Sequence, residues 1–129
     1  MTPELAALAA TAVIQAMMIM VAQRSLTADI GVAGNMGPRD GDLPLSPKTQ
    51  RLRRAVANHV ENIGLFIIAV VVVTLAQKTS AFTAACAWIF VAARALYLPA
   101  YAFGWAPGRS IIWSVGLIAT LAMLAAAFV

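Results

Sequence analysis

Residues 51–76 read RLRRAVANHVENIGLFIIAVVVVTLA, and this stretch decides the fold class. Its second half is an almost unbroken apolar run, which is too short to cross a bilayer by itself, because a spanning helix needs about 20 residues. The run reaches that length only if the helix begins near Thr49 or Gln50 and includes the polar motif. The sequence therefore predicts that Arg54, Asn58 and Glu61 belong to a membrane-spanning helix.

The composition of the whole chain also indicates a membrane protein. Of its 129 residues, 62% are hydrophobic and 11% are charged, whereas soluble domains are about half apolar and a quarter charged. Three further apolar stretches cover Leu5–Gln23, Thr79–Trp105 and Ser110–Val129. The first lacks the basic start of a signal peptide, and no polar domain follows it. Continuous runs also exclude a β-barrel, whose strands alternate.

We therefore expect an all-α integral membrane protein, an antiparallel bundle of four transmembrane helices in a single domain, residues 1–129. The expected helices cover about 3–24, 49–77, 80–103 and 108–129. Residues 25–48 form the expected long loop, because glycines and prolines recur through it. Within this loop, Asp40 and Asp42 have no third metal ligand at a recognised spacing, so we predict a solvated turn and no metal site.

The positive charge is concentrated on one side of the predicted membrane. Eight of the nine basic residues fall within Arg24–Arg54 and Arg94–Arg109, and Lys78 is the exception. The positive-inside rule makes that side cytoplasmic. We therefore expect the loops 25–48 and 104–109 in the cytoplasm, with both termini and Lys78 outside. This placement argues against nucleic acid as a partner.

Two polar stripes lie within the apolar helices. Arg54, Asn58 and Glu61 have the spacing i, i+4, i+7 and share one helix face. The second stripe is formed by Arg94, Tyr97 and Tyr101, at i, i+3, i+7. Ionisable groups at membrane depth cost about 2.5–3.5 kcal/mol each on insertion scales. They usually face a bundle interior or a cavity, so these stripes indicate a site.

The polar groups converge on one membrane side and carry surplus positive charge. Arg24 ends the first predicted helix there, and Arg109 and Ser110 begin the fourth. Only Glu61 opposes the cations, which predicts a pocket for an anion. Arginine favours carboxylates, because its planar fork can bond both oxygens.

Purely structural interpretations remain open for the same residues. Arg54 and Glu61 could form a pair that fixes packing, and Asn58 could bond across helices. Trp105 and Trp113, like the tyrosines, could belong to an interfacial aromatic belt. His59 lies alone on another face, so we expect an interfacial histidine.

The stretch RLRRAVANHVENIGLF resembles the signature of the MAPEG family, membrane-associated proteins in eicosanoid and glutathione metabolism. The matching residues are Arg54-Ala55, Asn58, Glu61 and the following Asn62. A second stretch, RALYLPAYAFGWAPGRS, is similar to the end of the family's third helix and the start of its fourth. This resemblance implies a homotrimer that binds glutathione between subunits near the cytoplasmic face. The implied glutathione-binding residues are Arg24, Arg54, Asn58, Glu61, Asn62, Arg94, Tyr97 and Tyr101, and the implied catalytic residues are Arg109 and Ser110.

The resemblance implies a glutathione-dependent membrane transferase or peroxidase, similar to microsomal glutathione transferases. In such an enzyme glutathione is the co-substrate, and its thiolate would attack a hydrophobic electrophile or a lipid hydroperoxide. The alanine-rich helices and short loops suggest a bacterial member in the inner membrane, with periplasmic termini. One alternative is a non-catalytic protein of the same fold that binds lipid or serves as an accessory subunit. A small transporter is disfavoured, because the charges cluster at one face and no inverted repeat is visible.

Overall fold

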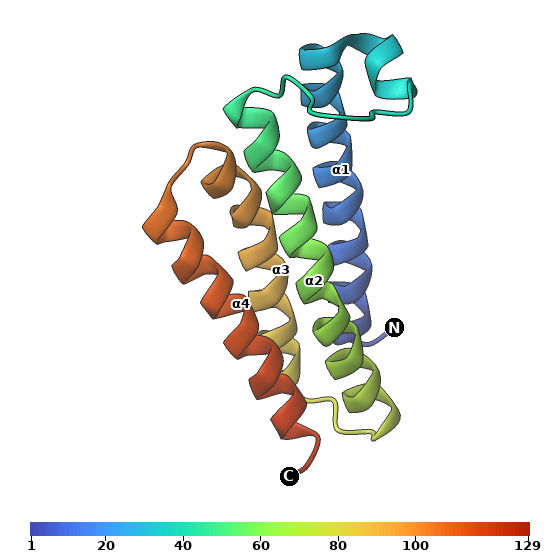
Figure 1. The fold of residues 1–129 in the computed structure, drawn as a ribbon. Helices are drawn as coiled ribbons and strands as arrows, with labels where there is room; N and C mark the ends of the chain where they lie inside the picture. The colour runs from blue at the N-terminus through green and yellow to red at the C-terminus, as the bar shows by residue number, and fades with distance from the viewer.

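The computed structural model describes residues 1–129 and contains four long helices (Figure 1). They are α1 (Pro3–Met36), α2 (Pro47–Leu75), α3 (Ala81–Ala102) and α4 (Ala106–Ala126). Each is long and apolar enough to cross a membrane. Successive helices run in opposite directions, so both termini lie at one end of the molecule. The connections 37–46 and 103–105 lie at the other end, which we call the loop end.

The two middle helices hold the bundle together. Both α1 and α4 contact α2 and α3, but α1 and α4 do not contact each other. The main core lies where α2 and α3 meet, and the rings of Phe66 and Phe90 stack there with centroids 4.0 Å apart. Large apolar side chains such as Ile68, Leu96 and Ile118 remain exposed on the outer faces. Such faces suit a lipid environment, where outward apolar side chains carry no hydration cost.

Local sequence signals explain where three of the helices begin. Ser46 caps α2 by accepting a hydrogen bond from the backbone N–H of Thr49, and Pro47 follows as the first helical residue. Ser80 caps α3, and its hydroxyl and that of Thr83 each accept from the other residue's backbone N–H. In contrast, the start of α4 has no side-chain cap.

The prediction that the first helix ends at Arg24 and that residues 25–48 form a loop is wrong. Helix α1 continues to Met36 and is interrupted only at Gly31, whose φ of 73° departs from helical geometry. The glycines and prolines of this region begin only at Gly31, so nothing in Ser25–Ile30 breaks the helix. The true connection is residues 37–46. The other three helices begin and end within three residues of the expected bounds.

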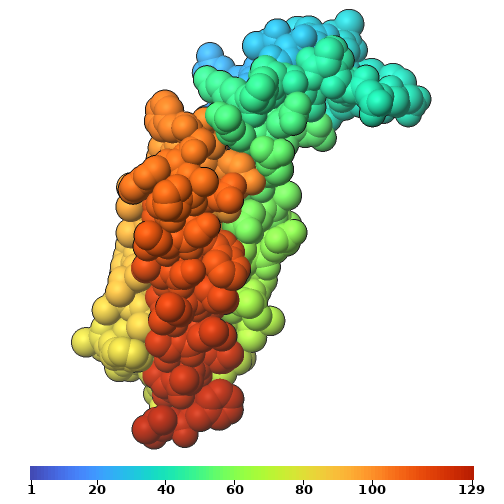
Figure 2. All heavy atoms as spheres, turned by 60° about the vertical axis from the view of Figure 1, so that its left-hand side comes forward, coloured from blue at the N-terminus to red at the C-terminus, as the bar shows by residue number.

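The added length of α1 is tied to the start of α2. The Asp29 carboxylate accepts hydrogen bonds from the backbone N–H and the hydroxyl of Ser46, at 2.8 and 2.9 Å. The Ser25 and Thr49 hydroxyls lie 2.6 Å apart. In Figure 2 the end of α1 and the following connection project to one side of the bundle. These bonds fix how α1 and α2 meet at the loop end.

Candidate functional site

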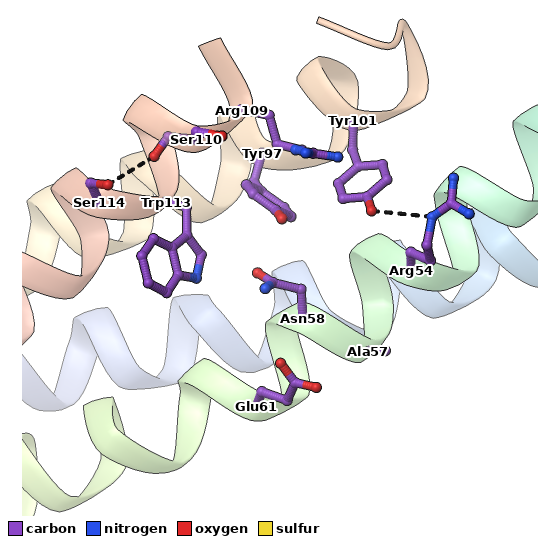
Figure 3. A pocket seen from close by; sticks show the side chains of 10 residues that line it. All are labelled: Arg54, Ala57, Asn58, Glu61, Tyr97, Tyr101, Arg109, Ser110, Trp113 and Ser114. Atoms are coloured by element: carbon purple, nitrogen blue, oxygen red, sulfur yellow. Dashed lines mark hydrogen bonds between the residues drawn. The ribbon is translucent and has the colours of Figure 1, made fainter. Parts of the chain in front are cut away.

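A polar pocket lies between α2, α3 and α4, toward the loop end (Figure 3). Its volume is about 560 Å³, which is within the usual range for small-molecule sites, about 300–1,000 Å³. The lining residues are Arg54, Ala57, Asn58, Glu61, Tyr97, Tyr101, Arg109, Ser110, Trp113 and Ser114.

Helical register explains why these side chains meet. On α2, positions 54, 57, 58 and 61 follow the i, i+3, i+4, i+7 pattern of a single face. On α3, positions 97 and 101 are one turn apart. On α4, positions 109 and 110 and positions 113 and 114 are also one turn apart. Three helices therefore present one polar face each to the same space.

Two arginines from different helices, Arg54 on α2 and Arg109 on α4, contact Tyr101. Its hydroxyl accepts a hydrogen bond from Nε of Arg54 at 3.2 Å. The guanidinium carbon of Arg109 lies 4.7 Å from the centre of the Tyr101 ring, a cation–π contact. Tyr97 packs edge-on against Tyr101, with ring centroids 5.6 Å apart. The tyrosine thus positions cations from α2 and α4 on the same side of the pocket.

Charge in the pocket is unbalanced. Arg54 and Arg109 line it, and Glu61 is the only acidic residue that does so. Arg54 donates to Tyr101, and Glu61 lies seven residues further along α2, about 10 Å by helical rise. The expected alternative of an Arg54–Glu61 packing pair is therefore not what orients Arg54. A ligand that carries more than one anionic group and one cationic group would complement this distribution.

Beneath the pocket, a buried polar group supports Asn58. Arg94 is fully buried, and its Nη1 donates to the side-chain oxygen of Asn58 at 3.4 Å. Asn62 donates to the backbone oxygen of Asn58 at 2.7 Å and to its side-chain oxygen at 3.4 Å. The guanidinium of Arg94 also lies 5.0 Å from the Tyr97 ring centre. Arg94 and Asn62 therefore orient Asn58, and neither lines the pocket.

The structure groups the residues that were predicted for the site into three sets. Seven of them line the pocket, and Arg94 and Asn62 lie directly beneath it. Arg24 is exposed on α1 and lies outside the pocket of its own chain. The seven lining residues are Arg54, Asn58, Glu61, Tyr97, Tyr101, Arg109 and Ser110.

Three pocket residues were not predicted from the sequence. Ala57 lies three residues after Arg54, and Trp113 and Ser114 lie one turn after Arg109 and Ser110. Helical spacing from the predicted residues could have found all three. Trp113, for which an interfacial belt was the alternative interpretation, is half-buried in the pocket wall.

The prediction of His59 as an interfacial histidine is also wrong. Its side chain is fully buried, and neither ring nitrogen has a hydrogen-bond partner. The reason is its register on α2. His59 follows Ala55 by four residues and precedes Phe66 by seven, and both of these residues are fully buried. It therefore belongs to the α2 face that packs against the other helices.

Comparison with known proteins supplies one match. The model of the MAPEG family matches residues 4–129, which include every residue of the pocket and nearly the whole bundle. No curated protein and no solved structure matches the chain significantly.

Proposed function

The chain belongs to the MAPEG family of membrane proteins of eicosanoid and glutathione metabolism, and on that premise we propose that it is a glutathione-dependent membrane transferase or peroxidase. The observation that carries this proposal is the pocket in which Arg54 and Arg109 meet on Tyr101 while Glu61 is the only acid. The second substrate is a hydrophobic electrophile or a lipid hydroperoxide.

Glutathione fits the chemistry of the lining residues. The tripeptide carries two carboxylates, one ammonium group, two amides and a thiol. Arg54 supplies a donor for a carboxylate, and Glu61 supplies an acceptor for the ammonium group. Asn58 and the tyrosine hydroxyls can bond to the amides. The surplus of cations over Glu61 corresponds to the net negative charge of the ligand.

We assign to Arg109 the role of lowering the pKa of the glutathione thiol. A free thiol has a pKa of about 8.5, so only a few per cent is thiolate at neutral pH. A cation within about 4–6 Å favours the charged form and lowers such a pKa by about 1–3 units. The thiolate then displaces a leaving group from an electrophilic carbon, which gives the glutathione thioether. With a hydroperoxide it attacks one peroxide oxygen, the O–O bond breaks and an alkoxide leaves, and a second glutathione reduces the resulting sulfenic acid to the disulfide and water. Ser110, beside Arg109 in the pocket, would donate a hydrogen bond to the same sulfur.

The assembly and orientation belong to the same proposal. Arg54 and Glu61 are exposed on the single chain although they lie in a helix apolar enough to span a membrane. In a homotrimer, a neighbouring subunit would cover this face, and its exposed Arg24 would add a cation from α1. We assign the loop end to the cytoplasm, because most basic residues lie toward it.

Calorimetry of glutathione with the detergent-purified protein tests the proposal. We expect saturable binding by wild type, loss of binding in Arg54→Ala, and normal binding by Arg53→Ala. Arg53 is the matched control, since it is an exposed arginine one residue away that does not line the pocket. Arg109→Ala should still bind glutathione, but the thiolate absorbance at neutral pH should fall about tenfold or more, as for a pKa rise of at least one unit.

Two results would overturn the proposal. If wild type shows no binding at millimolar glutathione, the pocket serves another ligand. If Arg53→Ala weakens binding as much as Arg54→Ala does, the effect comes from general surface charge and not from the pocket.

A further inference from the structure

A second cavity lies between α1, α2 and α3 at the loop end, and we propose that it binds an anionic phospholipid. The cavity has a volume of about 620 Å³ and shares no residue with the polar pocket. This proposal is therefore independent of glutathione chemistry. The lining residues are Val21, Lys48, Arg51, Leu52, Leu98, Pro99, Ala102 and Phe103.

The cavity is amphipathic in a way that suits a lipid. Most of its wall is apolar and comes from three helices, with Val21 on α1, Leu52 on α2 and Leu98 on α3. Lys48 and Arg51 are its only charged residues, and no acidic side chain lines it. They lie three residues apart in the first turns of α2, so they share a face. Two cations therefore lie at the loop end of this largely apolar cavity.

The guanidinium of Arg51 lies against the α3–α4 connection at Gly104, which follows the lining residue Phe103. A Cβ atom on Gly104 would lie 3.3 Å from the guanidinium carbon of Arg51, and Gly104 has a φ of +71°. Both the tight turn and the close approach of Arg51 thus favour glycine at this position. Pro99 and Ala102 line the α3 side, where Ala102 offers little side-chain volume. A lipid tail could lie against this wall with its headgroup near Arg51.

Charge and position favour a phospholipid over the other occupants. A soluble anion would need only the two cations, and the apolar wall would stay unused. A second copy of this chain would have to bring an acidic group to Lys48 and Arg51, but only five acidic residues exist in the chain. Of these, Asp29 already bonds to Ser46 and Glu4 to Thr83. The other three are Glu61, which lines the polar pocket, and Asp40 and Asp42, which lie beside Arg39 in the connection 37–46. Anionic headgroups gather at the basic end of a membrane protein and attract lysine and arginine there.

Native mass spectrometry of the delipidated, detergent-purified protein tests this proposal. The probes are phosphatidylglycerol and phosphatidylcholine with identical acyl chains. Wild type should bind phosphatidylglycerol more tightly. The double variant Lys48→Gln/Arg51→Gln should bind it about 30-fold more weakly, as expected for two lost cations at the headgroup, and should bind phosphatidylcholine almost unchanged. Arg53→Gln is the matched control and should behave as wild type does.

A second variant separates the tail from the headgroup. Ala102→Trp fills the cavity, so it should weaken binding of both lipids to a similar extent. Thermal unfolding of each variant verifies that the bundle has formed. Equal phosphatidylglycerol binding by wild type and the double variant would overturn the proposal, and so would an equal loss in Arg53→Gln. A change of oligomeric state with unchanged lipid selectivity would show that a second copy covers the cavity, and the proposal would again fail.

Discussion

Replacement of Arg94 by methionine should leave the bundle almost as stable as wild type, although the residue is a fully buried charge. Its Nη1 makes one long hydrogen bond, 3.4 Å, to Asn58, and its Nε and Nη2 have no partner. The rings of Phe90 and Tyr97 lie 5.2 and 5.0 Å from its guanidinium carbon. No acidic side chain pairs with it, so its stabilising contacts are these three.

The cost of burying Arg94 and the stabilisation from its three contacts nearly cancel in the free energy of unfolding. An arginine at membrane depth costs about 2.5–3.5 kcal/mol. Two cation–π contacts stabilise the folded bundle by about 0.5–2 kcal/mol each. A hydrogen bond near the distance limit contributes about 1 kcal/mol or less. Methionine keeps much of the side-chain volume and removes the charge. We therefore expect Arg94→Met to stay within about 1 kcal/mol of wild type, because removal of a poorly paired buried charge is often neutral or stabilising. Arg94→Ala should lose about 2–4 kcal/mol through the cavity that it leaves.

Unfolding by dodecyl sulfate in mixed micelles, followed by circular dichroism, gives both free energies of unfolding. Glutathione calorimetry gives a second measurement on the same proteins. Since Asn58 loses a donor, Arg94→Met should bind glutathione about fivefold more weakly, the effect of one modest hydrogen bond. Equal destabilisation by the methionine and alanine variants would refute the reasoning. It would show that the charge of Arg94 stabilises the bundle by more than its three contacts within the chain account for.

Two other contacts give sharp predictions. The Thr83 hydroxyl donates to Oε1 of the fully buried Glu4 at 2.6 Å, and Oε2 has no partner. Thr83→Val should therefore lower the free energy of unfolding by about 1–3 kcal/mol. Thr83→Ser keeps the hydroxyl and should not lower it. The same dodecyl sulfate titration measures both, and equal losses would contradict the role of the hydroxyl. A Cβ on Gly108 would lie 2.3 Å from the Trp105 ring, so Gly108→Ala should displace the start of α4 and weaken glutathione binding by about fivefold or more. Calorimetry of Gly108→Ala/Trp105→Ala should show recovery; a double variant as weak as the single one would exclude this clash as the cause.

The fold class was predictable because the membrane dictates simple rules. Apolar runs of spanning length must be helical, since backbone groups in hydrocarbon have no other partners. What the sequence did not reveal was the continuation of α1 beyond Arg24. Ser25–Ile30 contains no breaker, but the frequent glycines and prolines further on suggested a loop for the whole region. The helix extends through Asp29, whose bond to Ser46 is a tertiary contact. No local pattern predicts such a contact.

The site was predictable to the level of helix faces. Spacing placed Arg54, Asn58 and Glu61 on one stripe, and the pocket contains all three. Spacing could not distinguish a lining residue from one beneath it, since Arg94 shares a stripe with Tyr97 yet is buried below the pocket. That difference depends on the packing of α3 against α2 and α4. His59 shows the same limit, because a lone polar residue gives no sign of which helix will cover it.

The exposed charges of the pocket constrain the environment of this face. Arg54 and Glu61 are exposed on the single chain, in a helix that is apolar enough to span a membrane. Facing hydrocarbon, each would cost about 2.5–3.5 kcal/mol at the membrane centre and less near its surface. The cost falls if water, a ligand or a second subunit meets these groups. Because α1 does not contact α4, no helix of the same chain closes this side. A glutathione molecule enclosed by a second subunit would satisfy both charges at once, and it would leave the apolar side of α4 open to a substrate dissolved in the bilayer.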